Sequence, residues 1–193
     1  MRAGDATPET PRLVAPAVDY RASFLEALAE YQAEGRHLEL DLARMADPRE
    51  LARFVAALRA DADEPGATDR YALAAFGHEP DDPPFDGYVP QTVLWWAAGW
   101  EYIGRLNIRH ELNEGLLRSG GHIGYVVRPS ARGCGHATAM LAAALPLAAA
   151  LGIDPARVDC DVGNVASRRV IEKNGGLFER EEDGSWFFLV PTR

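Results

Sequence analysis

Residues 128–140 read RPSARGCGHATAM and begin at the end of an apolar run, 122–128, just before an alanine-rich run that stops at Gly152. This order predicts a strand, a short loop and a helix. A helix N-terminus leaves several backbone N–H groups unpaired and carries partial positive charge, so anions bind there. Gly133 and Gly135 let the backbone approach an anion, and Arg132 adds a forked, charged donor. The stretch therefore predicts a site for a phosphate or a pyrophosphate.

Two well-known nucleotide-binding loops do not fit this stretch. A Walker loop requires Lys-Ser or Lys-Thr after its last glycine, where this sequence has His136-Ala137. A Rossmann loop requires a third glycine three residues after Gly135, where Thr138 stands, and Pro129 interrupts a direct strand-to-helix turn. A glycine turn with a purely structural role remains the alternative to an anion site.

Helical and strand-like runs extend from this loop in both directions. The predicted helices are Asp19–Gln32, Asp47–Asp61 with Asp47 as its cap, 135–151 and Ala166–Lys173; the predicted strands are Leu13–Val14, Thr92–Ala97, Glu101–Arg109, His122–Arg128, Val158–Val162, Phe178–Glu182 and Trp186–Val190. Ala98-Gly99 is a predicted hairpin turn, and 79–90 and 113–121 are predicted loops. The strand–helix–strand succession implies a parallel, right-handed crossover between 122–128 and 158–162. We expect one α/β or α+β domain with a mixed sheet.

Length and composition are those of an ordinary soluble domain. The chain has 193 residues, of which 47% are hydrophobic and 25% charged, and we expect a flexible tail at 1–12 and a single domain at 13–193. An apolar leader and a membrane-length apolar stretch are both missing from the pattern, and two cysteines without a pairing pattern suit a reducing cytoplasm. The net charge of −9 argues against nucleic-acid binding and is compatible with attraction of a small cationic substrate or with solubility alone.

Two segments in order carry a resemblance to a known family. Arg132-Gly133-Cys134-Gly135-His136-Ala137 resembles the Arg-x-x-Gly-x-Gly/Ala segment of the GNAT superfamily of N-acetyltransferases, and DVGNVASRRVIEKNGG at 161–176 resembles its Asn-x-x-Ala/Ser segment. The resemblance covers residues 95–178, approximately. Within the family, the sequence is most similar to a bacterial branch with GGHIGY and VIEKNGG segments. It implies an α+β, GNAT-like fold with helices on both faces of a mostly antiparallel sheet. In that fold, a central parallel strand pair splays apart at the cofactor site.

The resemblance also implies a cosubstrate, acetyl-CoA, and the residues that hold it. Backbone groups of Val126 and Val127 are expected to pair with the pantetheine arm, and Asn164 is expected to bond it, with Ser167 bonding the arm or capping its helix. The pyrophosphate is expected on the N–H groups of a six-residue run with Arg132 beside it, namely Gly133, Cys134, Gly135, His136, Ala137 and Thr138. Cys134 is interpreted as a tolerated small side chain rather than a nucleophile.

The chemistry implied is direct attack of an amine on the thioester. An N–H near Tyr125 or Val126 is expected to polarise the thioester carbonyl. Many members of the family carry a tyrosine where this sequence has Ile171, so the acid for the thiolate is left open between Ser167, Tyr125, a water and no dedicated acid.

For the base, the alternatives are His122, Glu111 and His110, each of which also has a purely structural reading. RHELNE at 109–114 is not a zinc motif, because Glu114 stands where the second histidine belongs, and no metal is expected.

The expected acceptor is a primary amine of a small molecule, and its identity lies beyond the sequence. Transfer of another acyl group, transfer to a hydroxyl, and an acyl-CoA-binding sensor without catalysis are the alternatives. The apolar second half of the 135–151 helix leaves a homodimer contact and simple alanine abundance both open. Tryptophans 95, 96, 100 and 186 line an acceptor pocket or pack in the core, and Cys160 is expected to be buried.

Overall fold

A computed structural model describes residues 9–74 and 88–193 of the chain. Its strands are β1 (Arg12–Val14), β2 (Gln91–Ala98), β3 (Glu101–Arg109), β4 (Ile123–Val127), β5 (Ala156–Asp161), β6 (Leu177–Glu182) and β7 (Ser185–Val190). Its helices are α1 (Arg21–Ala33), α2 (Leu42–Ala46), α3 (Pro48–Ala60), α4 (Ala67–Ala74), α5 (Glu114–Arg118), α6 (His136–Ala150) and α7 (Val165–Lys173), with 3₁₀ turns at Val18–Tyr20 and Pro129–Ala131.

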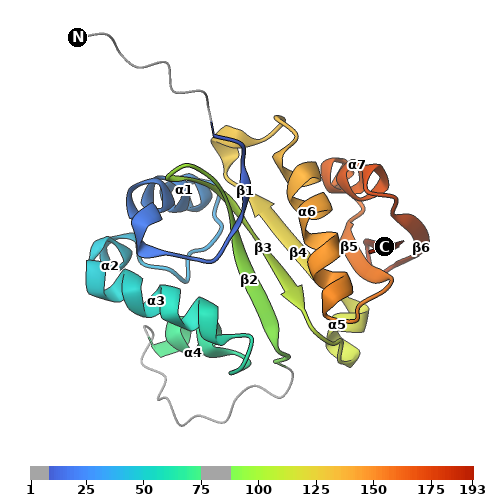
Figure 1. The fold of residues 1–193 in the computed structure, drawn as a ribbon, viewed down its shortest axis with the longest axis horizontal. Helices are drawn as coiled ribbons and strands as arrows, with labels where there is room; N and C mark the ends of the chain where they lie inside the picture. The colour runs from blue at the N-terminus through green and yellow to red at the C-terminus, as the bar shows by residue number, and fades with distance from the viewer. Residues whose placement is uncertain (1–8, 75–87) are drawn as a thin grey trace.

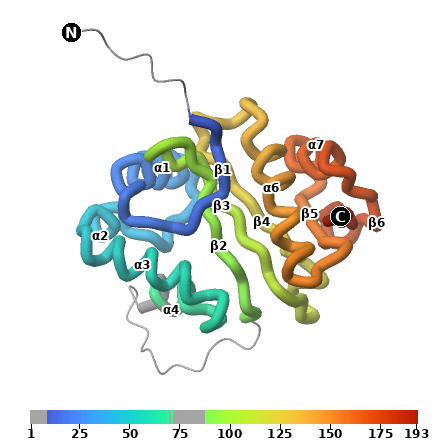
Figure 2. The backbone as a smooth tube through the Cα atoms, in the orientation of Figure 1, coloured from blue at the N-terminus to red at the C-terminus, as the bar shows by residue number. Residues whose placement is uncertain are grey.

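The strands form two antiparallel sheets, one in the order β1-β2-β3-β4 and the other in the order β5-β7-β6. Helices α1 to α4 gather on one side of the first sheet, and α6 and α7 lie with the second sheet on the other side (Figure 1). The tube drawing shows the same division, with the blue and cyan N-terminal helices opposite the orange and red C-terminal third (Figure 2). The expected α+β architecture with helices on both faces is confirmed.

Each face of the first sheet has its own hydrophobic core. On the side of α1 and α3, Phe24, Leu28 and Phe54 pack with Trp95. On the side of α6, Leu106, Ile123 and Met140 pack together with residues of the second sheet. Trp95 and Trp96 are both buried, which confirms the core reading for these two, whereas Trp100 is 69% exposed. Core packing on both faces thus fixes the position of the sheet between the two groups of helices.

Most predicted elements are present, and the differences are short helices. The helix predicted from Asp47 is α3, and the Asp47 carboxylate accepts the Arg49 N–H at 2.7 Å as the expected cap. The loop predicted at 113–121 instead contains α5, because the Asn113 side chain caps it by accepting from Leu116 N–H at 2.9 Å. Sequence periodicity also did not predict α2 and α4. The hairpin turn between β2 and β3 is Gly99-Trp100, one residue later than expected, with Gly99 at φ 54.

Two expectations fall wholly or partly outside the described residues. Residues 1–8 of the predicted tail lie there, and the chain is already in β1 at Arg12, so the tail at 1–12 and the domain at 13–193 stay predictions. Residues 79–87 of the predicted 79–90 loop lie there as well.

Strands β4 and β5 are the expected crossover pair, and they separate along their length. At their starts, the His122 N–H donates to the Arg157 carbonyl at 2.7 Å. At their ends, Val127 and Asn164 line a cleft between them. The two strands therefore run in the same direction, touch at one end and splay at the other, so the described chain has two sheets rather than one continuous mixed sheet.

Candidate functional site

The cleft between β4 and β5 has a volume of about 520 Å³ and opens at the carboxyl ends of the two strands. Its walls come from four places: the end of β4, the loop to α6 with the first turn of that helix, helix α7 with its cap Asn164, and Arg36 after α1. The lining residues are Arg36, Tyr125, Val126, Val127, Ala131, Arg132, Gly133, Gly135, His136, Ala137, Thr138, Asn164, Ala166, Ser167, Arg169, Val170 and Lys173. Sheet edges of this kind, outside the carboxyl ends of diverging parallel strands, are where ligands bind in α/β proteins.

The loop predicted to hold an anion leaves its backbone N–H groups open to approach. Gly133 and Gly135 have φ of 80° and 84°, a conformation that L side chains rarely adopt, and a Cβ at either would meet nothing within 4 Å. Within the described chain, the N–H groups of residues 133–138 make no hydrogen bond, and Ala139 is the first to donate, to the Gly135 carbonyl at 3.1 Å. Free N–H groups at a helix N-terminus, approached without obstruction, form an anion site.

Positive charge surrounds this loop. Arg132 was predicted, whereas Arg36, Arg169 and Lys173 also line the cleft and were missed. Arg169 and Lys173 are four residues apart on α7 and therefore lie on one face of the helix, a spacing that could have revealed them. No local pattern reveals Arg36, because it reaches the cleft from the far side, after α1. The site is basic in a chain whose net charge is −9.

Arg132 is held in place before any ligand arrives. Its two terminal nitrogens donate to the two carboxylate oxygens of Glu34, each at 2.8 Å, and its Nε donates to the Val127 carbonyl at 3.1 Å. Glu34 follows α1, so this bidentate pair ties the end of α1 to the anion loop.

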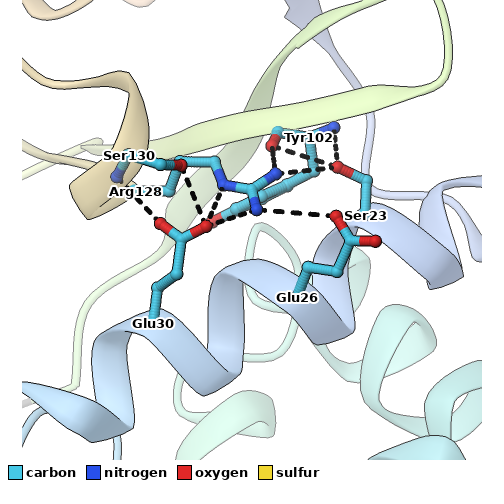
Figure 3. Close-up of polar contacts among 6 residues, drawn as sticks. All are labelled: Ser23, Glu26, Glu30, Tyr102, Arg128 and Ser130. Carbon is cyan, nitrogen blue, oxygen red and sulfur yellow. Dashed lines mark hydrogen bonds and ion pairs between the residues drawn. The ribbon is translucent and has the colours of Figure 1, made fainter.

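A second carboxylate, one turn earlier on α1, ties the same loop. Glu30 accepts from the Nε of Arg128 at 3.0 Å and from its NH2, and it accepts from the N–H and hydroxyl of Ser130, each at 2.9 Å (Figure 3). The guanidinium is buried and also donates to Ser23 Oγ at 3.2 Å and to the Tyr102 carbonyl at 3.4 Å.

The hydrogen bonds drawn in Figure 3 determine the charge state of Glu30. Burial raises the pKa of Glu30, but hydrogen bonds from Arg128 and Ser130 outweigh this and lower that pKa to about 2. Glu30 is therefore ionised at neutral pH. We call Glu30 and Glu34 with Arg128 and Arg132 the α1 clamp.

The backbone of β4 divides between its two neighbours. Arg128 N–H donates to the Ile103 carbonyl and Arg109 N–H donates to the His122 carbonyl, so even-numbered residues direct their backbone groups to β3. Because the direction alternates along a strand, the backbone groups of Tyr125 and Val127 face the cleft and those of Val126 face β3. Of the expected backbone partners, Tyr125 N–H and Val127 N–H are therefore available to a ligand, whereas the Val127 carbonyl already accepts from Arg132.

The second motif supplies one wall of the cleft. The Asn164 side-chain oxygen accepts from Ser167 N–H at 3.0 Å, so Asn164 and not Ser167 caps α7, and its amide NH₂ group remains a donor. The Tyr125 hydroxyl donates to the Ser167 carbonyl at 3.4 Å. Burial raises the pKa of Tyr125 to about 12, although its bond to Ser167 lowers it, so the phenol keeps its proton. Ile171, at the position of the family's tyrosine, is fully buried in the core.

The residues predicted as bases lie at the opposite end of β4 from the cleft. The His122 Nδ1 accepts the Arg157 N–H at 2.9 Å, and burial, Arg157 and Arg109 all lower the pKa of His122. Glu111 is exposed just beyond β3, and the His110 ring bonds the Thr92 hydroxyl at 2.8 Å. None of these three lines the cleft, and a catalytic role for His122 or Glu111 stays a prediction.

The described residues include both cysteines, and they also bear on the expectations for metal sites and membrane-spanning helices. Cys134 is exposed and does not line the cleft, whereas Cys160 is buried as expected, and burial raises the pKa of its thiol to about 11. Among residues 9–74 and 88–193, His, Cys, Asp and Glu side chains form no group of three or more placed to hold a metal ion. Over the same residues, every helix is too short or too polar to cross a bilayer.

Comparison with known proteins agrees with this geometry. Three solved structures share the fold over most of their length: RimL, a ribosomal L7/L12 alpha-N-protein acetyltransferase (16% identity, TM-score 0.53, 99% of this chain and 98% of that one); MccE, a microcin C7 self-immunity acetyltransferase, in complex with acetyl-CoA and AMP (13%, 0.57, 94% and 92%); and yncA, a putative acetyltransferase from Salmonella typhimurium with its cofactor acetyl-CoA (13%, 0.53, 97% and 95%).

At these identities the likeness establishes the fold alone. Curated protein sequences gave no match. A family model described as an acetyltransferase (GNAT) domain matches residues 31–176, which is well over half of the chain and includes both motifs and the whole anion loop. The chain therefore belongs to the GNAT acetyltransferase family.

Proposed function

We propose that this protein transfers the acetyl group of acetyl-CoA to a primary amine of a small molecule, by direct attack in a ternary complex. The observation that carries the proposal is the cleft itself. It combines the free N–H groups of 133–138 with positive charge from Arg132, Arg36 and Arg169, between strands that leave room for an extended chain. A phosphate-bearing ligand with a long, hydrogen-bonding arm matches this combination.

Different residues of the cleft bind different parts of acetyl-CoA. The N–H groups of residues 133–138, with Arg132 and Arg36, bind the pyrophosphate of acetyl-CoA. Arg169 and Lys173 add positive charge that attracts its third phosphate. The free amide group of Asn164 and the backbone N–H of Val127 hydrogen-bond the pantetheine arm. MccE and yncA, which share the fold, were solved with acetyl-CoA.

Acetyl-CoA supplies an acetyl group activated as a thioester. The backbone N–H of Tyr125 faces the cleft and stabilises the oxygen on which charge develops. The Tyr125 hydroxyl is protonated because its pKa is raised to about 12, and in this step it exchanges its hydrogen bond to the Ser167 carbonyl for one to the departing sulfur. The Ser167 hydroxyl beside it is the second donor. Ile171 contributes no proton, being buried in the core.

The acidic surface supports an amine acceptor, because a net charge of −9 raises the local concentration of small cations. RimL is described as acting on the N-terminus of a ribosomal protein, so a peptide N-terminus belongs in the test beside small amines. Transfer to a hydroxyl, transfer of another acyl group and cofactor binding without turnover are the competing outcomes.

A thiol-release assay tests the proposal. Purified protein is mixed with acetyl-CoA and one class of acceptor at a time: aminoglycosides, polyamines, amino acids, alcohols that have no amine, and a short peptide with a free N-terminus. The release of free thiol is followed over time. We expect amine-dependent release, with the acetylated amine identified by mass spectrometry. Micromolar acetyl-CoA affinity by calorimetry with no release from any acceptor would contradict the transferase and support a sensor. Failure to bind acetyl-CoA at all would contradict both.

A further inference from the structure

We propose that His37, oriented by Glu39, is the general base that takes the proton from the acceptor amine. The inference rests on the proposed function and assigns a catalytic residue that neither sequence motif contains. His37 lies in the loop between α1 and α2, and three independent features point to it: its conformation, its position next to the cleft residue Arg36, and its hydrogen bonding.

The backbone of His37 is held in an uncommon conformation. Its φ is 54°, in the left-handed region that non-glycine residues rarely adopt, and in the described chain Asp183 is the one other such residue. The His37 carbonyl fixes this geometry by accepting from Gln32 Nε2 and from Leu40 N–H, each at 3.2 Å. Strain of this kind persists where the surroundings over-determine it, which is typical of functional side chains.

The ring of His37 has one nitrogen occupied and one free. Its Nδ1 lies 3.1 Å from Glu39 Oε1, and its ring packs edge-on against Tyr31 with centroids 5.0 Å apart. Within the residues that the structure describes, Nε2 has no hydrogen-bond partner. A carboxylate on Nδ1 fixes the tautomer with the proton on Nδ1, so that Nε2 carries the lone pair a base needs.

The position of His37 links the cofactor cleft with the face of the sheet under α1. Its neighbour Arg36 lines the cleft. His37 itself does not, but lines a second, small cavity together with Tyr31, Arg105 and the core residue Trp95. Arg105 of β3 pairs in register with Val126 of β4, which also lines the cleft. Directly opposed residues in an antiparallel pair have Cβ atoms about 4.5–5.5 Å apart. The register therefore sets Arg105 of the second cavity beside Val126 of the cleft, and the proposal has the acceptor amine lie between these two residues.

Arg105 supplies hydrogen-bonding capacity in this second cavity. Tyr31 is 3% exposed, and its hydroxyl bonds with the hydroxyl of Tyr102, which lines the same cavity. Arg105, in contrast, makes no ion pair with any of the residues that the structure describes. The cavity volume of about 20 Å³ is that of one water molecule or one amino group. Because a buried polar group without a partner is costly, a hydrogen-bonding group of the acceptor is the expected occupant.

The charges facing His37 keep its imidazole neutral. Burial lowers the pKa of His37 below 6.5, Arg105 from β3 and Arg36 lower it further, and Glu39 partly opposes them. Tyr31, on α1, is uncharged because burial raises the pKa of its hydroxyl. At neutral pH the ring is therefore unprotonated and able to accept a proton.

The proposed step balances without any further reagent. An acceptor that arrives as an ammonium ion first loses one proton to solvent. The neutral amine nitrogen then forms a bond to the acetyl carbon while one of its two remaining protons passes to His37 Nε2. The bond from that carbon to sulfur then breaks, and its electron pair leaves with the sulfur as CoA thiolate, hydrogen-bonded by Tyr125. The imidazolium returns its proton through solvent, so that the products are the acetylated amine and the CoA thiol.

The backbone conformation of His37 allows substitutions that remove the imidazole without straining the loop. Glycine and asparagine tolerate a φ of 54°, so His37→Asn and His37→Gly keep the loop without strain. Leu38→Asn is the matched control, because Leu38 is 65% exposed in the same loop. With acetyl-CoA and the fastest amine found in the thiol-release screen, we expect kcat to fall about 100-fold or more in both His37 variants, in line with the usual contribution of a general base.

Three readouts separate a base from a structural residue. Calorimetric affinity for acetyl-CoA should stay within two-fold of the wild type, added imidazole should restore part of the activity of His37→Gly, and the acid limb of the kcat–pH profile should disappear in His37→Asn. Glu39→Gln removes the group that raises the pKa of His37, so the acid limb should move to lower pH with a smaller loss of kcat.

The possible failures are distinguishable. A wild-type protein that binds acetyl-CoA but acetylates no amine overturns the proposed function and the base with it. A wild-type protein that turns over, with an unchanged kcat and acid limb in His37→Asn, overturns the base alone. Loss of the acid limb in His122→Asn instead would assign the base to the other end of β4.

Discussion

The two ends of the β4–β5 pair use similar residues for opposite purposes. At the starts of the strands, His122 N–H donates to the Arg157 carbonyl at 2.7 Å and His122 Nδ1 accepts the Arg157 N–H at 2.9 Å. Gly121 has a φ of 52°, and a Cβ there would lie 2.5 Å from the Arg157 carbonyl oxygen. This end is closed by contacts that leave no room for a side chain.

At the other end, glycine serves to keep space empty. Gly133 and Gly135 also have positive φ, yet a Cβ at either would meet nothing within 4 Å. Removing side chains here exposes N–H groups to a ligand rather than to another strand. The comparison teaches that the closed end fixes the separation that the open end uses, so changes at the two ends should affect different properties.

The largest effect is expected from Gly135→Asp, which places a carboxylate where the proposed function has the pyrophosphate bind. We expect acetyl-CoA affinity to fall at least about 100-fold, which is roughly 2.7 kcal/mol. Gly152→Asp is the matched control, because Gly152 has a φ of 82° and open space around it, but lies just beyond the opposite end of α6. Calorimetry with acetyl-CoA distinguishes them, and equal affinity in the two variants would contradict the loop assignment.

Gly121→Ala should break the closed end while sparing the open one. A methyl group 2.5 Å from the Arg157 carbonyl, in a left-handed conformation, should cost about 2–4 kcal/mol of unfolding free energy. Gly184→Ala, with a φ of 78° and nothing within 4 Å, measures the conformational part alone at about 1 kcal/mol. Urea denaturation gives both values. If the two variants were equally stable, the contact with Arg157 would not be what holds the strands together.

The α1 clamp should contribute to stability in a pH-dependent way. Glu30→Gln leaves the buried Arg128 without its anion and should cost about 1–3 kcal/mol. Glu26→Gln, on the same helix and 3.6 Å from the same guanidinium, is the control; its side chain is exposed, and we expect at most about 0.5 kcal/mol.

The sign of the pH effect follows from the lowered pKa of Glu30. Its stabilisation is present above the ordinary pKa of 4.5 and is lost as the pH falls through the folded value of about 2. The difference in unfolding free energy between the wild type and Glu30→Gln should therefore shrink as the pH falls from 4.5 toward 2. A difference that stays constant over that range would mean that Glu30 acts through packing and not through charge.

Local sequence patterns were sufficient to predict the strand ends, turns and helix starts of the two segments that line the cleft. The loop at 128–140 and the segment at 161–176 each contain their own strand end, turn and helix start, so glycine spacing and the Asn164 cap specify them without distant contacts. The α1 clamp is different. Glu30 and Glu34 meet the loop across 98 to 100 residues of chain, and no periodicity in α1 indicates which acids are paired.

The positions of His122 and Glu111 show what strand alternation alone does not specify. Strand alternation correctly puts His122 on the same face as Gly124 and Val126, but it does not say at which end of the strand the cleft opens. The direction of the crossover does indicate that end, because ligands bind at the carboxyl ends of parallel strands.

The short helices were not predicted for another reason. Helices α2 and α5 have five residues each, which is too few for a periodic pattern.

The smallest effect should come from the rim of the open end. Arg169 lines the cleft, whereas its neighbour Arg168 turns away, pairing with Glu172 at 2.8 Å and stacking on the Trp186 ring at 4.6 Å. Arg169→Gln should weaken acetyl-CoA binding by up to about 1 kcal/mol, because exposed charges interact weakly through water, and the loss should shrink as salt rises. Arg168→Gln should leave affinity unchanged. Titrations at low and high salt test the pair, and a salt-independent loss would show that Arg169 makes a desolvated contact deep in the cleft rather than a screened one at its rim.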